Sequence, residues 1–305
     1  MANQHGRDLR SSKMPDFLGV GAQRSGTSWL YKNLGQHPQI WLPPIKELHY
    51  FSSKEKSQKR KTNIVKNAFR VRVRDSLRDI FSLNSAVLDD FSWDFRYFFG
   101  KRDLAWYYSL FRAASNQISG EITPEYSTLT TKKIRDIKTL NPKLKIIYLM
   151  RDPIDRSWSS TIKDLARNRR RTIDTVPDDE VFNKLSRTGT MLRSNHLCVL
   201  EKYESVFNHE QVFIGFFEDV IERPQKLLKD ICRFLGVSTA QEHNSSDIKK
   251  KVNSSGKYRS PIPTRFHVYL ARQQIDQLRK LNKRFGGPAT NWLKSAEEIL
   301  AKAKG

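Results

Sequence analysis

Residues 17–30 have the sequence Phe17-Leu18-Gly19-Val20-Gly21-Ala22-Gln23-Arg24-Ser25-Gly26-Thr27-Ser28-Trp29-Leu30. A short apolar run stops at Gly21, a polar turn follows, and an amphipathic stretch runs from Thr27 to about Gly35. This order predicts a strand, a loop that wraps around an anion, and a helix. Glycines let the chain turn closely, so that successive N–H groups and the start of the helix face the anion.

The loop resembles a nucleotide-binding loop only in part. Gly21 and Gly26 have the spacing of a Walker A motif, but Thr27 stands where that motif has lysine, and the basic residue is Arg24. Because the lysine that reaches the β- and γ-phosphates is missing, the loop indicates an anion other than ATP. A dinucleotide loop is also disfavoured, because Arg24 takes the place of its third glycine. An ordinary strand–turn–helix connection has the same glycine spacing and stays a possible interpretation of the loop alone.

Composition limits the classes of protein that the chain can belong to. Its 305 residues, 38% of them hydrophobic, are enough for one large globular domain. The formal net charge of +23 implies an anionic partner, such as a nucleotide, an acidic polysaccharide, an anionic membrane surface or nucleic acid. No apolar run reaches the ~18 residues of a membrane span, and residues 1–15 do not resemble a signal peptide. We expect Cys198 and Cys232 to be reduced thiols, no metal site, and a cytoplasmic location.

Strand-like and helical patterns alternate along the chain. We expect a basic tail over residues 1–14 and one domain over 15–305, with an insertion or lid at 52–105 and C-terminal helices at 264–305. The alternation predicts a parallel sheet in an α/β fold. Strands are predicted at 17–21, 118–121, 144–150 and 212–217, an extended segment at 46–51, and helices at 106–114, 128–140, 191–207, 223–235, 265–285 and 291–301.

A second candidate anion site follows the strongest predicted strand, residues 144–150. The segment Arg151-Asp152-Pro153-Ile154-Asp155-Arg156-Ser157-Trp158-Ser159 begins there, with Pro153 suited to the first turn of a helix. Ligands in open α/β sheets lie outside the carboxyl ends of the strands, so this segment and the first loop should face one crevice. Arg151 and Ser159 lie on one side of the segment and are placed to bind a second phosphate, with Arg156 as a further candidate. Alternatively, Arg151 pairs with Asp152 or Asp155.

The two motifs together resemble those of the PAPS-dependent sulfotransferases. These are R-S-G-T-S-W after one strand and R-D-P-x-x-R-x-x-S after a later one, while K-E-x-H-Y-F at 46–51 is similar to the carbohydrate, or heparan-sulfate, branch. The resemblance covers about residues 15–50 and 116–260. It implies a P-loop-like three-layer α/β/α fold with a central, mainly parallel sheet and no Mg²⁺. It also implies 3′-phosphoadenosine 5′-phosphosulfate (PAPS) as donor, with 3′,5′-ADP as product.

The resemblance also implies roles for individual residues of the donor site. Arg151 and Ser159 would hold the 3′-phosphate, and Trp29 would lie near the adenine unless it belongs to the core. Lys257 and Arg259 belong to a basic loop that resembles the one closing over the nucleotide; an ordinary surface loop is the alternative. The residues that would hold the 5′-phosphosulfate are Arg24, Ser25, Gly26, Thr27 and Ser28.

Sulfuryl transfer needs a base for the acceptor hydroxyl and cations for the departing bridging oxygen. Glu47 has the position of the base in the heparan-type enzymes that the chain resembles. His49 is the rival base or an orienting partner, and it shares a face with Glu47 if the segment is extended. Arg24 is the candidate that stabilises the leaving phosphate. A plain surface ion pair between Lys46 and Glu47 is the alternative for that segment.

The acceptor is the least defined part of this prediction. The basic and aromatic residues of 52–105, and the basic run between Lys163 and Arg171, suit an acidic glycan, so we expect a carbohydrate hydroxyl. Small alcohols, lipids and peptide tyrosines stay open as other acceptors. Ile122 replaces a lysine frequent in heparan-type relatives, and Glu121 either lines the site or is structural. Two other functions stay open: a P-loop kinase or NTPase, opposed by the missing Walker lysine, and a basic nucleic-acid-binding protein.

Overall fold

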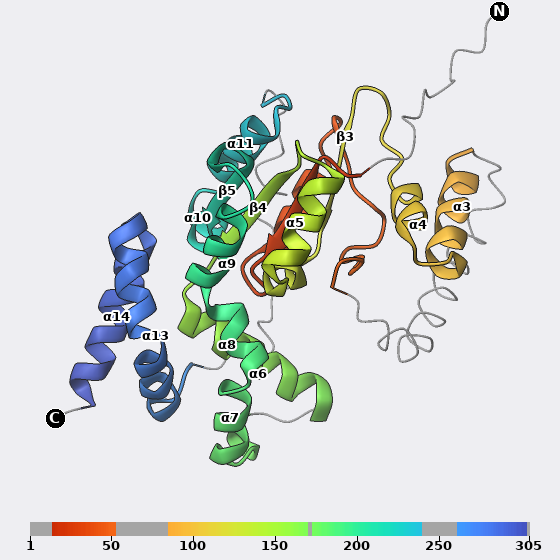
Figure 1. Cartoon of the computed structure of the whole chain (residues 1–305). Helices are drawn as coiled ribbons and strands as arrows, with labels where there is room; N and C mark the ends of the chain where they lie inside the picture. Colours follow the sequence, from red (N-terminus) through yellow and green to blue (C-terminus); the bar gives the residue numbers. More distant parts are fainter. Residues whose placement is uncertain (1–13, 53–84, 170–172, 240–260, 304–305) are drawn as a thin grey trace, which may run out of the picture.

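A five-stranded sheet forms the centre of the structure, and all of its strand pairs are parallel (Figure 1). The computed structural model describes residues 14–52, 85–169, 173–239 and 261–303. The strand order is β2-β3-β1-β4-β5, which confirms the predicted α/β class with a parallel sheet. The strands are β1 (Phe17–Gly21), β2 (Ile40–Trp41), β3 (Ile118–Ile122), β4 (Lys145–Met150) and β5 (Val212–Phe216).

Helices connect the strands and cover both faces of the sheet (Figure 1). The α-helices are α1 (Thr27–Leu34), α3 (Ser85–Phe99), α4 (Leu104–Ser109), α5 (Thr131–Leu140), α6 (Pro153–Arg169), α7 (Asp178–Leu185), α8 (Thr188–Ser194), α9 (His196–Glu204), α10 (Phe217–Glu222), α11 (Pro224–Leu235), α13 (Thr264–Phe285) and α14 (Pro288–Lys302). Short 3₁₀ turns are η4 (Pro124–Thr128), η5 (Ile173–Thr175) and η6 (His209–Gln211).

The alternation of side chains along the central strands divides the core into two layers. Phe17 and Ile147 belong to a cluster on one face, together with apolar residues of α1 and α11. Leu18 and Ile146 point to the other face and join a larger cluster with residues of α5, α6 and α9. Both faces of the strands are therefore buried, as is usual for parallel sheets.

The two C-terminal helices and the described part of the region 52–105 join the larger cluster. α13 and α14 pack against each other, and Phe266 of α13 stacks on Trp158 of α6 with 5.7 Å between the ring centroids. Trp93 of α3 and Trp106 of α4 are buried in the same cluster. The division into tail, domain and insertion stays a prediction, because residues 1–13 and 53–84 lie outside the described part.

Three predicted elements differ from the structure. Residues 46–51 form no strand, since Glu47 and His49 have left-handed φ angles of 67° and 58°. The predicted helix 191–207 is two helices, because Asn195 has a non-helical ψ of 78° and its side chain instead accepts a hydrogen bond from the N–H of Cys198 as the N-cap of α9. The predicted helix 106–114 is the shorter α4. Pro153 opens α6 and Gly236, with φ 80°, closes α11, as predicted.

The strand order brings three connecting segments to one edge of the sheet. β1 pairs with β3 on one side and β4 on the other, so the segments that follow these strands emerge next to each other.

Cys198 and Cys232 are both free thiols, the first half-buried and the second buried. None of the helices within the described ranges is long and apolar enough to cross a membrane.

Candidate active site

The loop between β1 and α1 turns sharply and leaves several hydrogen-bonding groups for a ligand. Arg24 and Gly26 both have left-handed φ angles, 70° and 84°, so the chain turns sharply before α1. No side-chain hydrogen bond caps α1 in the described structure and its first turn has no acidic residue, which leaves backbone N–H groups for a ligand. The Ser25 hydroxyl is fully buried and has no partner among the described residues. A buried hydroxyl of this kind is costly unless a ligand satisfies it.

The predicted second anion site meets this loop directly. Arg24 Nε donates to Ser159 Oγ at 3.0 Å, and Arg151 Nη1 donates to the backbone oxygen of Arg24 at 3.2 Å. Burial, and then the nearby charge of Arg151, lower the pKa of the Arg24 guanidinium. Two guanidiniums held this close repel each other, and an anion between them would offset that repulsion. The arrangement therefore suits a phosphate-bearing ligand.

Arg151 also has partners on the side away from the loop. Its Nη2 donates to Asp155 Oδ2 at 3.1 Å, and its guanidinium lies 4.7 Å from the centroid of the Phe217 ring. The alternative pairing with Asp155 is thus present together with the contact to Arg24. The Nε of Arg151 is buried without a hydrogen-bond partner among the described residues, which leaves a donor for a ligand.

A buried histidine holds the backbone of Arg151. His196 Nε2 lies 2.7 Å from the carbonyl oxygen of Arg151, and its Nδ1 lies 2.7 Å from the hydroxyl of Tyr148. A carbonyl oxygen only accepts, so Nε2 carries the proton and Nδ1 accepts from the tyrosine. Burial lowers the pKa of His196 to about 4, and the hydrogen bond to Arg151 opposes this shift. The imidazole is therefore neutral at pH 7.

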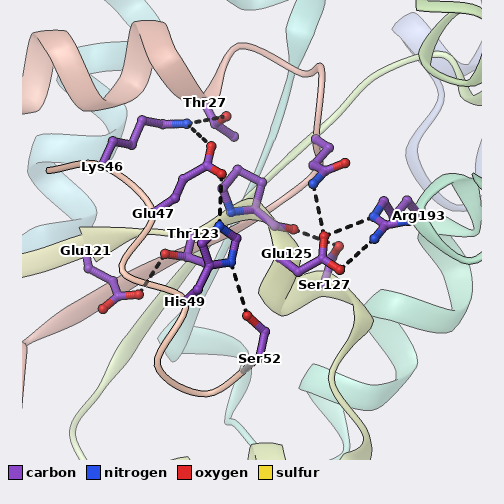
Figure 2. Close-up of polar contacts among 12 residues, drawn as sticks. Thr27, Lys46, Glu47, His49, Ser52, Glu121, Thr123, Glu125, Ser127 and Arg193 are labelled. Atoms are coloured by element: carbon purple, nitrogen blue, oxygen red, sulfur yellow. Dashed lines mark hydrogen bonds and ion pairs between the residues drawn. The ribbon is translucent and has the colours of Figure 1, made fainter. Parts of the chain in front are cut away.

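Glu47 contacts two basic side chains of its own segment, Lys46 and His49 (Figure 2). Lys46 Nζ donates to Glu47 Oε1 at 2.7 Å and lies 3.4 Å from Thr27 Oγ1 at the start of α1. His49 Nε2 is 3.4 Å from Glu47 Oε2, and its Nδ1 is 3.2 Å from Ser52 Oγ. Glu47 and His49 are brought together, as predicted, but by left-handed backbone around the buried Leu48 rather than by an extended strand.

The neighbours of Glu47 keep it ionised. The pKa of Glu47 is lowered to about 2, because the hydrogen bonds and charges of His49 and Lys46 outweigh the effect of burial, which alone would raise it. Its side chain is 34% exposed, so it is accessible to a ligand. A carboxylate in this state can accept a proton or a hydrogen bond.

A second carboxyl group lies beneath this segment, at the end of β3. Glu121 is buried and accepts hydrogen bonds from Tyr107 Oη and Thr123 Oγ1, each at 2.8 Å. Burial raises its pKa, and its hydroxyl partners oppose the shift. These partners favour the structural interpretation of Glu121. The neighbouring Ile122 is buried in the cluster of α1 and α11 and faces away from Glu121.

An ion pair connects the loop to α8. Arg193 makes two hydrogen bonds to Glu125, from Nε at 3.1 Å and from Nη2 at 2.6 Å. Gln23 Nε2 donates to Glu125 Oε2 at 3.0 Å (Figure 2). Paired hydrogen bonds of this kind fix the geometry of both partners. No short-range sequence pattern joins positions 23, 125 and 193, so the sequence carries no signal for this cluster.

Two of the predicted ligand-binding residues, Trp29 and Arg156, have buried side chains. Trp29 is buried in the cluster of α1 and α11, which favours the packing role over the adenine contact. The side chain of Arg156 is fully buried and bonds to Ser194 Oγ and the Thr190 carbonyl, which ties α6 to α8 and favours a structural role. Its Nη1 is buried without a hydrogen-bond partner among the described residues, so Arg156 as a further phosphate-binding candidate stays a prediction. Lys257 and Arg259 lie outside the described residues.

Comparisons with known proteins show the family of the chain. The sequence model described as "Sulfotransferase family" matches residues 15–241, and the chain therefore belongs to the sulfotransferase family. It is 33% identical over 79 residues to human carbohydrate sulfotransferase 15, covering 26% of this chain and 12% of that protein. It is 22% identical over 325 aligned positions to the mouse bifunctional heparan sulfate N-deacetylase/N-sulfotransferase 4, covering 94% of this chain and 32% of that protein. The chain spans a third or less of the length of these curated relatives.

A solved structure supports the fold. The crystal structure of a sulfotransferase from Alicyclobacillus acidocaldarius superimposes with a TM-score of 0.62 at 22% identity, covering 92% of this chain and 98% of that one. This likeness confirms the predicted P-loop-like α/β fold.

The buried His196 leads to a prediction about stability and pH. The unfolded chain gains a proton on this residue below pH ~6.5, whereas the folded protein gains it only near pH 4, so folding stability should fall as the pH decreases through this window, by about 3 kcal/mol. Asp152 gives the opposite pH dependence. Loss of hydration raises its pKa to about 7, so the folding stability that its protonated form contributes is lost as the pH rises from ~4 to 7.

The histidine's effect is therefore measured as a difference between two proteins. The stability advantage of the wild type over His196→Gln should be largest near pH 7 and smaller by about 3 kcal/mol near pH 4. Urea unfolding of both proteins at several pH values measures it. An advantage that does not change with pH would contradict the assigned buried, neutral imidazole.

Proposed function

We propose that this sulfotransferase moves a sulfuryl group from PAPS to an acceptor hydroxyl, with Glu47 as the general base. The observation that carries the donor assignment is the meeting of two anion-binding elements at Arg24, which contacts both Ser159 and Arg151. A donor with phosphate groups at both ends of its ribose requires two such elements side by side. ATP has no 3′-phosphate, and the chain has Thr27 in place of the Walker lysine.

The residues of the loop suit the 5′ end of the donor. Ser25 offers a buried hydroxyl without a partner among the described residues, and the start of α1 offers backbone N–H groups. Gly26, Thr27 and Ser28 complete this set, as the family resemblance implies. Arg151 and Ser159 are proposed to hold the 3′-phosphate. Bound in this way, PAPS supplies the activated sulfuryl group.

The acceptor hydroxyl is proposed to bind beside Glu47 and His49. Glu47 is ionised and partly exposed, so it can take the proton as the hydroxyl attacks. His49 is proposed to orient Glu47 through their 3.4 Å contact. Sulfuryl transfer depends mostly on positioning the two reactants and on stabilising the charge that develops on the leaving phosphate.

A carbohydrate is the proposed class of acceptor. Curated relatives are a carbohydrate sulfotransferase and a heparan sulfate N-sulfotransferase, and the net charge of +23 suits an acidic glycan. The cytoplasmic location stays a prediction from the sequence, and one relative, from Dictyostelium discoideum, is named as a membrane-associated sulfotransferase (24% identity, 65% of this chain and 33% of that protein).

Thermal unfolding with nucleotides tests the donor. At ~100 times its dissociation constant, 3′,5′-ADP should add ~2.7 kcal/mol to the free energy of unfolding and raise the midpoint of thermal unfolding by about 5 °C. The comparison ligands are 5′-AMP and ATP with Mg²⁺. A shift with ATP–Mg²⁺ alone would instead favour a kinase or NTPase. If no nucleotide shifts the midpoint, binding to polynucleotides at several salt concentrations tests the nucleic-acid alternative.

Arg151→Ala tests the 3′-phosphate assignment. Because a hydrogen bond to a charged group contributes ~1.5–3 kcal/mol, the variant should bind 3′,5′-ADP about 10- to 100-fold more weakly and bind 5′-AMP as the wild type does. Isothermal titration measures both affinities. Arg279→Ala removes an exposed arginine on α13 and serves as the control for lost charge. Equal weakening of both nucleotides would contradict the assignment.

Glu47→Gln tests the base. The variant should keep its affinity for 3′,5′-ADP and lose about 10²- to 10⁴-fold in turnover, measured as release of 3′,5′-ADP from PAPS with a glycan acceptor found by screening. Since the pKa of Glu47 is about 2 in the free protein, the wild-type kcat/KM for PAPS should not fall between pH 8 and 5 through protonation of the base. A fall across that range with retained Glu47→Gln activity would make His49 the base. Glu298→Gln, on the exposed face of α14, is the matched control.

A further inference from the structure

The phosphate loop lacks the lysine of a Walker motif, but the structure places a lysine from another segment next to it. Thr27 has the sequence position of the missing lysine. Lys46, 19 residues later, brings its Nζ to 3.4 Å from Thr27 Oγ1. The side chain is only 18% exposed and reaches the start of α1 from the segment after β2 (Figure 2).

Arg24, the basic residue within the loop, has its contacts on the side of the loop opposite to Lys46. Its Nε is bonded to Ser159 of α6 and its carbonyl accepts from Arg151, so its contacts are with the segments that follow β4. Lys46 instead approaches from the side of β2 and β3, where Glu47 and His49 lie. The loop is thus flanked by a guanidinium on one side and an ammonium on the other.

We propose that Lys46 is a catalytic residue whose ammonium contacts the 5′-phosphate of the donor and stabilises the charge that develops there. The inference rests on the proposed function and adds a residue to it. In the reaction, a bond forms between the acceptor oxygen and sulfur, and the bond between sulfur and the bridging oxygen breaks. The hydroxyl proton goes to Glu47. The electron pair of the broken bond stays on the bridging oxygen of the 5′-phosphate, next to Lys46.

The second contact of Lys46 gives this role a consequence for the base. Among the described residues, the side chains of Lys46 and His49 contact Glu47, and both lower its pKa. An anion at Thr27 competes with Glu47 for the ammonium. When Lys46 turns toward that anion, the pKa of Glu47 rises and the carboxylate becomes a stronger base. Glu47 is thereby activated when the donor is bound.

A simpler role for Lys46 is to hold Glu47 in place without touching the donor, and affinities for product analogues separate the two roles. Lys46→Met leaves the Glu47 charge unpaired, which would itself repel an anion. The comparison is therefore made between Glu47→Gln and the double variant Lys46→Met/Glu47→Gln. The two ligands are 3′,5′-ADP and 3′-AMP, which differ only in the 5′-phosphate.

We expect the double variant to bind 3′,5′-ADP about 10-fold more weakly than Glu47→Gln does, with unchanged affinity for 3′-AMP, by isothermal titration. Lys46→Arg should restore most of the affinity. Lys32→Met, near the other end of α1, removes the same charge away from the loop and should bind both ligands as the wild type does. Thermal unfolding of each variant without ligand shows that it is folded.

The possible failures are distinguishable. If the wild type binds 3′,5′-ADP and the double variant binds it as tightly as Glu47→Gln does, Lys46 does not contact the 5′-phosphate, and the proposed function stands without it. If the wild type does not bind 3′,5′-ADP, the donor assignment fails and the role of Lys46 fails with it. Weakening of both ligands to the same extent also contradicts a specific contact with the 5′-phosphate.

Discussion

The parallel pairing of β1 with β3 on one side and with β4 on the other is the constraint on which the site depends. Because β1 is central, the loop that follows it lies between the segments that follow its two neighbours. Arg151 comes to this loop from the end of β4, and Glu125 comes to it from the end of β3. The apolar layers on both faces of the sheet fix the strands, and the hydrogen bonds between Arg24, Ser159 and Arg151 are formed at the edge that these strands share.

Much of the fold could be predicted from the sequence because its signals are local. The apolar runs of β1 and β4, Pro153 at the start of α6 and Gly236 at the end of α11 each act within a few residues. Both motifs follow parallel strands, which predicts that they face one crevice, and the hydrogen bond between Arg24 and Ser159 shows that the two segments meet.

The rest of the site depends on contacts that no local pattern encodes. Arg193 contacts Glu125, which is 68 positions away in the sequence. The position of Arg156 after β4 made it a candidate to bind phosphate, and its full burial depends on contacts with α8 that the sequence does not show. The contact of Lys46 with Thr27 depends on how the chain turns after β2, where an extended segment was predicted and the backbone is instead left-handed at Glu47 and His49.

The left-handed residues around Leu48 bear on how rigid the proposed acceptor side of the site is. A non-glycine residue in this conformation costs on the order of 1 kcal/mol and persists only where its surroundings enforce it. Here the buried Leu48 side chain anchors the segment in the core, while the residues on either side of it face one another. A segment held in this way has little conformational entropy left to lose when an acceptor binds. The free energy spent on ordering it has been supplied during folding, so the carboxylate and the imidazole are preorganised before any substrate arrives.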